Sequence, residues 1–71
     1  MSEAKTRFAA NLRAQRRERG LSQDALARAC RLHRTEISLL ERGEREPRLS
    51  TVVRLARALR VPAASLLDGV D

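Results

Sequence analysis

The sequence predicts an all-α protein, a compact bundle of five short helices. Apolar residues recur at three- and four-residue spacing, as in helices that bury one face. Residues that cap or end helices separate these runs, and no segment alternates apolar and polar residues as a strand would. The 71 residues are expected to form one domain, residues 1–71, with a short flexible N-terminus at about residues 1–4.

Two helices are predicted in the first half of the chain. The first spans about residues 4–18, where one face carries Phe8, Ala9, Leu12 and Arg16. Gly20 can end this helix. Ser22 can cap a second helix that runs to about Ala29, with a hydrophobic staple formed by Leu21 and Leu26.

Three more helices are predicted in the second half. The third runs over about residues 33–41, and Gly43 can end it. The fourth covers about residues 49–60, with apolar positions at helical spacing: Val52, Leu55, Ala56 and Leu59. Pro62 suits the first turn of a short fifth helix that ends near Asp68.

The charge of the chain indicates a polyanionic partner. The net charge is +6, and Lys5 is the only lysine among 15 basic residues. Arginine suits phosphate oxygens and guanine edges, although a genomic preference for arginine codons would also produce this excess over lysine. Phe8 is the only aromatic residue, which disfavours a membrane-surface helix and a site for RNA or single strands, because these depend on aromatic side chains. Double-stranded DNA is the favoured partner.

Other kinds of site find little support. One histidine, no glycine-rich phosphate loop and no paired carboxylates leave no basis for an enzyme, and no cofactor or small-molecule ligand is expected. Cys30 and His33 stand three positions apart, but a structural zinc takes four ligands, so no metal is expected. A single cysteine, no apolar leader and no apolar run of about 20 residues favour a cytoplasmic protein.

The most informative stretch is residues 23–42, QDALARACRLHRTEISLLER. Two short helices joined by a short turn can cross steeply only where the side chains at the crossing are small, and Ala27 meets this requirement. Apolar residues are expected to fill the wedge between them: Leu26, Cys30, Leu32, Ile37 and Leu40. This helix-turn-helix at about residues 22–41 resembles the phage repressor and Cro-type (XRE-like) family. The resemblance extends to RAQRRERGLSQDALA before the turn and VVRLARALRVP after it.

The chain departs from the pattern of this family at two positions of the turn. Arg31 stands where the family usually has glycine. A left-handed backbone there would cost of order 1 kcal/mol, unless the turn has different dihedral angles. His33 stands where the family prefers Ser, Thr or Asp as a helix cap, which leaves Glu36 without its usual capping-box partner.

The resemblance implies that the second helix of the motif reads the major groove with its N-terminal part. The expected base-reading residues are Arg34, Thr35, Glu36, Ser38 and Leu39. Arg34 suits guanine, Thr35 and Leu39 suit a thymine methyl group, and the Glu36 carboxylate suits N4 of cytosine. The alternative is a solvated polar face, and Leu39 could instead cover a neighbouring loop.

A second group is expected to contact phosphates: Gln23, His33, Arg42, Arg45 and Arg48. By resemblance, Gln23 clamps the DNA backbone from the first turn of its helix, where free N–H groups and the helix dipole favour an anion. The three arginines follow the reading helix in a loop that tracks the sugar-phosphate chain in the family. Arg45 alternates with Glu44 and Glu46 and could instead be an ordinary surface charge.

Two charged residues interrupt apolar helix faces. Arg16 continues the apolar face of the first helix and Glu41 that of the third, and burial of either alone would be strongly unfavourable. We expect them to pair, and the resemblance implies the same bridge; two solvated charges are the alternative. Three arginines of the fourth helix are interpreted as a solvated stripe: Arg54, Arg57 and Arg60.

The resemblance also implies assembly, because family members bind as two-fold dimers across half-sites about 10 bp apart. The expected dimer interface is apolar: Leu66, Leu67 and Val70. The predicted function is a sequence-specific transcription regulator that binds a palindromic operator in double-stranded DNA as a homodimer. It is similar to stand-alone regulators of bacterial or phage origin, such as phage repressors and restriction–modification controller proteins. The alternative is an antitoxin-like or adaptor protein that mainly binds a partner protein.

Overall fold

The computed structural model describes residues 3–71. Within this range the chain forms no strand and five helices: α1 (Glu3–Glu18), α2 (Gln23–Cys30), α3 (Arg34–Glu41), α4 (Leu49–Leu59) and α5 (Ala63–Leu67). The predicted all-α class is confirmed. Because α1 begins at Glu3, the last two residues of the stretch expected to be flexible are helical, and residues 1–2 lie outside the described part of the chain.

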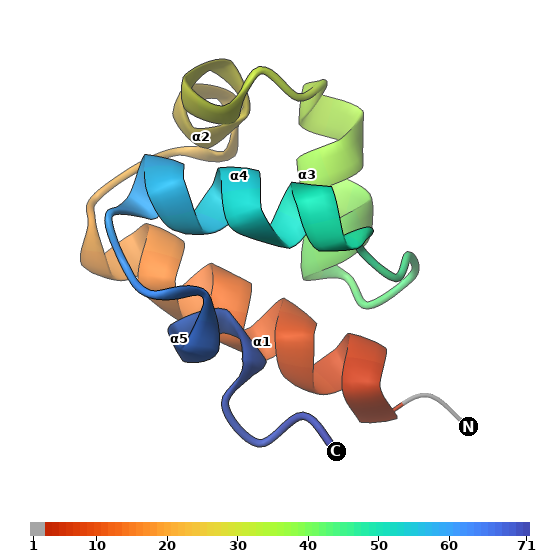
Figure 1. Ribbon diagram of the computed structural model, residues 1–71. Coiled ribbons are helices and arrows are strands. Elements are labelled where there is room, and N and C mark those ends of the chain that lie inside the picture. The colour runs from red at the N-terminus through yellow and green to blue at the C-terminus, as the bar shows by residue number, and fades with distance from the viewer. Residues whose placement is uncertain (1–2) are drawn as a thin grey trace.

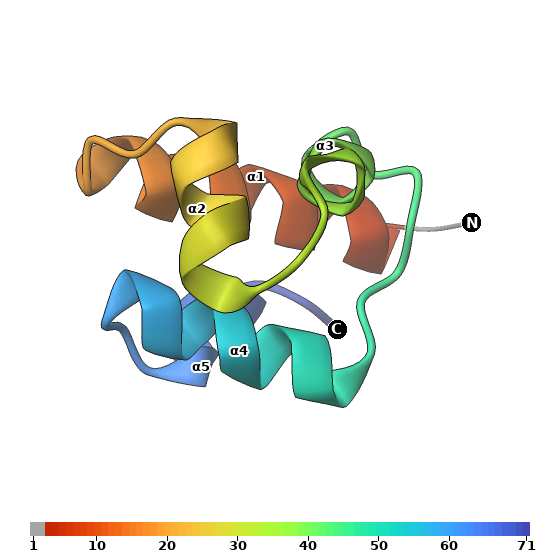
Figure 2. The ribbon, with the colours of Figure 1, turned by 90° about the horizontal axis from the view of Figure 1, so that it is seen from above.

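α4 packs against α2 and α5, while α1 packs against α3 and α5, and α2 and α3 pack against each other. In Figure 1 α4 crosses the view with α2 above it and α1 and α5 below it. In that view α2 is seen along its axis and α3 from the side. Seen from above, the relation is reversed (Figure 2). The axes of α2 and α3 therefore cross steeply, as the helix-turn-helix prediction requires.

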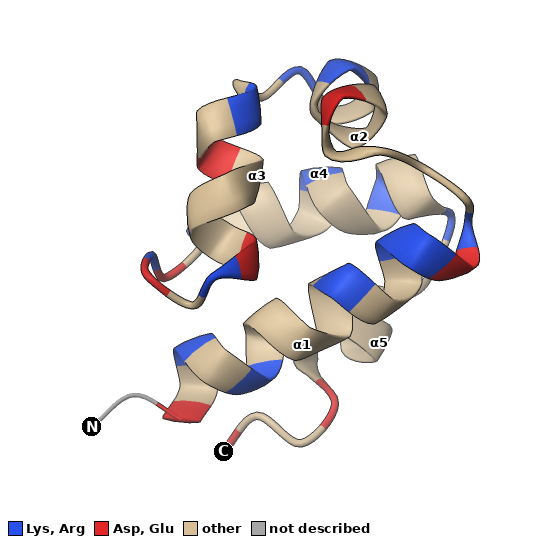
Figure 3. Ribbon diagram, turned by 180° about the vertical axis from the view of Figure 1, so that it is seen from behind, with Lys and Arg blue, Asp and Glu red and all other residues tan. Residues whose placement is uncertain are grey.

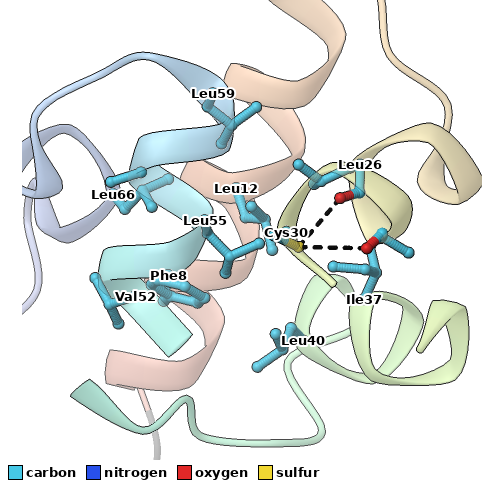
Figure 4. Close-up of a cluster of buried hydrophobic side chains, with 12 residues drawn as sticks. Phe8, Leu12, Leu26, Cys30, Ile37, Leu40, Val52, Leu55, Leu59 and Leu66 are labelled. Carbon is cyan, nitrogen blue, oxygen red and sulfur yellow. Dashed lines mark hydrogen bonds between the residues drawn. The ribbon is translucent and has the colours of Figure 1, made fainter. Parts of the chain in front are cut away.

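Every helix contributes to one apolar core (Figure 4). The largest side chains that are fully buried are Leu12, Leu26, Ile37, Leu40, Leu55, Leu59 and Leu66. The apolar residues that the sequence placed between α2 and α3 belong to this cluster, and Leu32 packs against it from the turn. Because the buried residues of α3 recur at helical spacing, one face of this helix points into the core and the other points outward.

One member of the expected dimer interface is misplaced. Leu66 is fully buried within the chain, so it cannot lie on an interface between copies. The physical reason is the docking of α5 onto α1, where Asn11 Nδ2 donates to the backbone oxygens of Leu66 and Asp68, each at 2.9 Å. Leu67 is 40% exposed and Val70 is partly buried.

Helix ends follow the sequence closely. Ser22 caps α2 as predicted, because its side-chain oxygen accepts the N–H of Ala25 at 3.0 Å. Pro62 is the N-cap of α5 rather than part of its first turn. Arg60, expected to end the fourth helix, is a left-handed C-cap with φ 58° and ψ 44°. Within residues 3–71 no helix has the length and apolar character needed to cross a membrane.

Candidate nucleic-acid interface

The C-terminal end of α3 is fixed by the carboxylate of Glu41, which is only 3% exposed. The expected ion pair with Arg16 is present, with 2.5 Å between Arg16 Nε and Glu41 Oε2. Glu41 Oε1 accepts from Arg16 Nη2 at 3.0 Å and from Gln23 Nε2 at 3.1 Å. The hydrogen bond to Glu41 raises the pKa of the Arg16 guanidinium, although burial acts in the opposite direction. This cluster joins α1, α2 and α3 at one point.

Two further contacts strengthen this junction. Arg16 Nη1 donates to the backbone oxygen of Leu21 at 2.8 Å, and Arg13 donates to the backbone oxygen of Glu41. Within residues 3–71 every buried side-chain nitrogen and oxygen atom has a hydrogen-bond partner. A buried ion pair stabilises a defined geometry only when its remaining donors and acceptors are satisfied, and that condition is met here.

The N-terminal end of α3 follows a turn of three residues. Arg31 is left-handed, with φ 58° and ψ 41°. Of the two alternatives for this position, the turn therefore keeps the left-handed backbone and does not adopt different dihedral angles. The N–H of Arg31 donates to the oxygen of Arg28 at 3.3 Å, and the N–H of Leu32 donates to the oxygen of Ala27 at 2.9 Å. These bonds close the end of α2 although the turn contains no glycine.

Arg54 also reaches this turn from α4. Its Nε donates to the backbone oxygen of Cys30 at 3.1 Å and its Nη2 to that of Arg31 at 2.7 Å. Arg54 is exposed, as expected for the solvated stripe, but it also makes contacts that the prediction did not include. The contact depends on how α4 packs against α2, and helical spacing within α4 does not show it.

His33 supplies the cap that the sequence left in doubt. Its Nδ1 accepts the N–H of Thr35 at 3.1 Å, so an imidazole replaces the usual hydroxyl or carboxylate. Glu36 has a different partner from that of a capping box, since its Oε1 accepts from Arg45 Nη1 at 2.6 Å. The first turn of α3 is thus held by residues that precede and follow it.

The predicted base-reading residues lie on the side of α3 away from the core. Arg34 and Thr35 are exposed, and the others are partly buried: Glu36, Ser38 and Leu39. Arg34 Nε lies 3.3 Å from Asp24 Oδ1 of α2, and both side chains are well exposed, at 62% and 59%. Sequence reasoning missed Asp24, because the pair forms only when α2 and α3 cross at this angle.

The residues expected to contact phosphate have different surroundings. The side chain of Gln23 is partly buried, and its Nε2 donates to Glu41 rather than pointing outward. Arg42 Nη2 lies 3.5 Å from Glu44 Oε1, while Arg48 is exposed at the N-cap of α4. Acidic and basic residues alternate in this loop, and basic residues occur on each of α1 to α4 (Figure 3).

A hollow of about 520 Å³ lies beside the first turn of α3. It is bordered by the α2–α3 turn, the loop after α3 and the start of α4, and its basic lining residues are Arg31, His33, Arg45, Arg48 and Arg54. Glu36 and Glu46 also line it. The positive potential near α3 is therefore partly neutralised by carboxylates, and a phosphate would have to compete with them.

The residues Cys30 and His33 are engaged in other contacts. The Cys30 thiol is buried and donates to the oxygens of Leu26 and Ala27 at 3.1 and 3.8 Å (Figure 4). Burial raises the pKa of this thiol. In the described part of the chain no three potential metal ligands lie together.

A short helix set steeply across its neighbour, anchored at both ends and with polar residues on its outer face, defines a DNA-binding helix-turn-helix protein. Comparison with known families leads to the same class. A family model described as helix-turn-helix (HTH_3) matches residues 12–66. The chain belongs to this family of DNA-binding transcription regulators, which confirms the resemblance to XRE-type proteins.

Several relatives are controller proteins. The chain is 45% identical over 60 residues to the control protein C.SmaI of Serratia marcescens, covering 84% of this chain and 71% of that protein. It is 46% identical over 48 residues to the control protein C.BamHI of Bacillus amyloliquefaciens, covering 68% of this chain but only 59% of that protein. The crystal structure of the restriction-modification controller protein C.AhdI from Aeromonas hydrophila superimposes with a TM-score of 0.85 at 35% identity. That match covers 87% of this chain and 94% of C.AhdI.

Proposed function

We propose that this chain is a sequence-specific transcription regulator that acts in the cytoplasm as a homodimer on a palindromic operator. The observation that carries the proposal is the way in which α3 is fixed in the bundle. Its C-terminal end is tied to α1 and α2 through Glu41, while its first turn leaves Arg34 and Thr35 exposed. A helix fixed in this way can enter the major groove without losing its orientation.

The side chains of the outer face suit the base edges of DNA. Arg34 offers a fork of donors that matches O6 and N7 of guanine, a contact that contributes about 1–3 kcal/mol of discrimination. Glu36, held in place by Arg45, can accept from N4 of cytosine, and Ser38 can bond to several bases. Thr35 and Leu39 can contact thymine methyl groups.

Phosphate contacts would place this helix in register. The arginines of the loop after α3, Arg42, Arg45 and Arg48, are exposed. Arg42 would exchange Glu44 for phosphate. Arg45 binds Glu36 through Nη1, so its Nη2 can donate to a phosphate oxygen at the same time. His33 accepts through Nδ1, so its Nε2–H can donate to a phosphate oxygen. Because the side chain of Gln23 is occupied, we assign its phosphate contact to the backbone N–H groups at the start of α2.

We propose that the second copy docks on the apolar surface formed by Pro47, Leu49, Leu67 and Val70. Leu49 is 77% exposed and Leu67 40%, and they are the largest apolar side chains exposed among residues 3–71. All four residues line one mainly apolar hollow of about 260 Å³. A single reading helix covers only a few base pairs, so a self-complementary contact here would add the second half-site.

The likeness to controller proteins supports a role of the same kind. C.AhdI is described as a restriction-modification controller protein, and the chain matches nearly its whole length. We propose that this chain likewise controls transcription of restriction–modification genes.

Selection from a random pool of duplexes tests the proposal. The purified chain should enrich one palindrome with half-sites about 10 bp apart. If the three loop arginines of each copy contact phosphate, affinity should fall about a thousandfold between roughly 50 and 200 mM salt. Absence of an enriched sequence, together with salt-insensitive capture of a protein partner, would favour the partner-binding alternative.

Sedimentation velocity tests the dimer surface. Leu67→Glu should leave the chain monomeric at micromolar concentration and weaken binding to the full palindrome. Ala14→Glu adds the same charge at an exposed position of α1 and should leave the assembly unchanged. A wild-type chain that stays monomeric with and without the palindromic duplex would contradict the dimer.

A further inference from the structure

The turn between α2 and α3 combines two features that need an explanation. Its first residue, Arg31, has a left-handed backbone that an L side chain adopts less readily than glycine. The backbone oxygens of Cys30 and Arg31 both accept hydrogen bonds from the same guanidinium of Arg54. We propose that Arg54 is a positioning residue for DNA recognition, which holds this turn and thereby sets the angle at which α3 meets DNA. The inference rests on the proposed function of α3.

The turn leaves little freedom for the backbone to absorb a change. Only residues 31–33 separate α2 from α3, and each has a defined role. Arg31 is left-handed, Leu32 packs against the core, and His33 caps α3. A change of the dihedral angles at Arg31 would therefore be passed directly to the first turn of α3.

Arg54 is suited to preventing such a change. The oxygens it binds lie at the C-terminal end of α2, where the helix dipole favours a positive charge. Charge-assisted bonds to two successive oxygens fix the plane of the peptide group after Arg31 as well as the end of the helix. Arg54 acts from α4, which packs against α2, and it also borders the hollow beside the first turn of α3, so the test must separate its contacts from its charge.

The chain contains a second arrangement of the same kind. Arg60 at the end of α4 is also left-handed, and its backbone oxygen accepts from Arg19 Nη2 of α1 at 2.9 Å. This second turn leads into α5 and away from α3. It therefore provides a matched control, in which an arginine of equal charge makes the same type of contact without touching the reading helix.

The test compares Arg54→Met with Arg19→Met. Binding to the selected duplex is measured by fluorescence anisotropy, well below the melting temperature of each variant. We expect Arg54→Met to raise Kd at least tenfold and Arg19→Met no more than about threefold. Arg54→Lys keeps the charge but has one donor group in place of the fork, so it should give an intermediate Kd.

Rescue by glycine separates positioning from loss of charge. A glycine at position 31 adopts the left-handed backbone without strain, so adding Arg31→Gly to Arg54→Met should lower Kd again, although the double variant lacks a further positive charge. Equal Kd values for the Arg54 and Arg19 variants, or no recovery in the double variant, would overturn the proposal.

Hydrogen exchange of the free protein keeps this test separate from the proposed function. Loss of the Arg54 contacts should speed exchange of the amides of Arg31 and Leu32, whereas Arg19→Met should leave them unchanged. If the wild-type chain selects no duplex but this exchange pattern holds, Arg54 still holds the turn and only the DNA-binding proposal fails. If Arg54→Met leaves the exchange unchanged, the positioning role is wrong.

Discussion

Replacement of Glu41 by alanine should be among the most destabilising single substitutions in this chain. Glu41→Ala removes the acceptor of three side-chain hydrogen bonds. It leaves the guanidinium of Arg16, whose side chain is 12% exposed, and the amide of Gln23 without that partner. Breaking a buried pair from one side costs about 3–5 kcal/mol.

That loss is large for a chain of 71 residues. At roughly 0.05–0.15 kcal/mol per residue, the free energy of unfolding is about 4–11 kcal/mol. A loss of about 3 kcal/mol should lower Tm by roughly 12–24 °C, since 1 kcal/mol corresponds to about 4–8 °C in a domain of this size. Urea unfolding followed by circular dichroism, together with a thermal melt, measures both quantities.

Glu44→Ala is the matched control. It removes the same charge, but Glu44 lies 3.5 Å from Arg42 with both side chains more than half exposed, so the change should be within about 1 kcal/mol. Equal, small effects of the two substitutions would show that Glu41 is not part of a stabilising buried pair. The double variant Arg16→Met/Glu41→Leu should lose much less stability than Arg16→Met and Glu41→Leu lose in sum, because it leaves no unpaired buried charge.

Two further predictions concern the loop after α3 and the core. Arg48→Gln should weaken binding by a similar factor for all sequences. It should also reduce the steepness of the fall of log K with log salt by about 0.9 per chain, measured by anisotropy titrations at several salt concentrations. A loss confined to one base position would contradict a phosphate role. Burial raises the pKa of the Cys30 thiol, so the native state holds this proton to higher pH than the unfolded state does. The resulting stability is complete below the unfolded pKa of about 8.5 and is lost as the pH rises through the higher folded pKa. Wild-type protein should therefore lose more stability between about pH 7 and pH 10 than Cys30→Ala does in urea unfolding, and equal losses would show that the thiol does not contribute.

Much of the fold could be predicted because it depends on local patterns. Apolar spacing located every helix, and Ser22 marked the start of α2. The junction of α1, α2 and α3 was also accessible, because Arg16 and Glu41 are charges on apolar faces and burial forces such charges to pair. Each of these features can be recognised within one helix or its cap.

The features that were missed depend on how one element lies against another. Helical spacing placed Arg54 on a solvated face, yet its guanidinium reaches back to the end of α2. Asp24 meets Arg34 only across the crossing of two helices. Likewise, the division between Leu66 inside and Leu67 outside follows from the orientation of α5, which the bonds from Asn11 fix.

Base reading by α3 is tested by a base-by-base comparison of wild-type protein with Arg34→Met. Every position of the selected half-site is substituted singly, and Kd is measured for each duplex with both proteins. Arg34→Met should abolish the preference for guanine at one position, worth about 1–3 kcal/mol, and leave the other preferences intact. Arg57→Met, which removes an exposed charge from α4, should preserve the whole pattern. A uniform loss of affinity in Arg34→Met, with every base preference retained, would contradict base reading by α3.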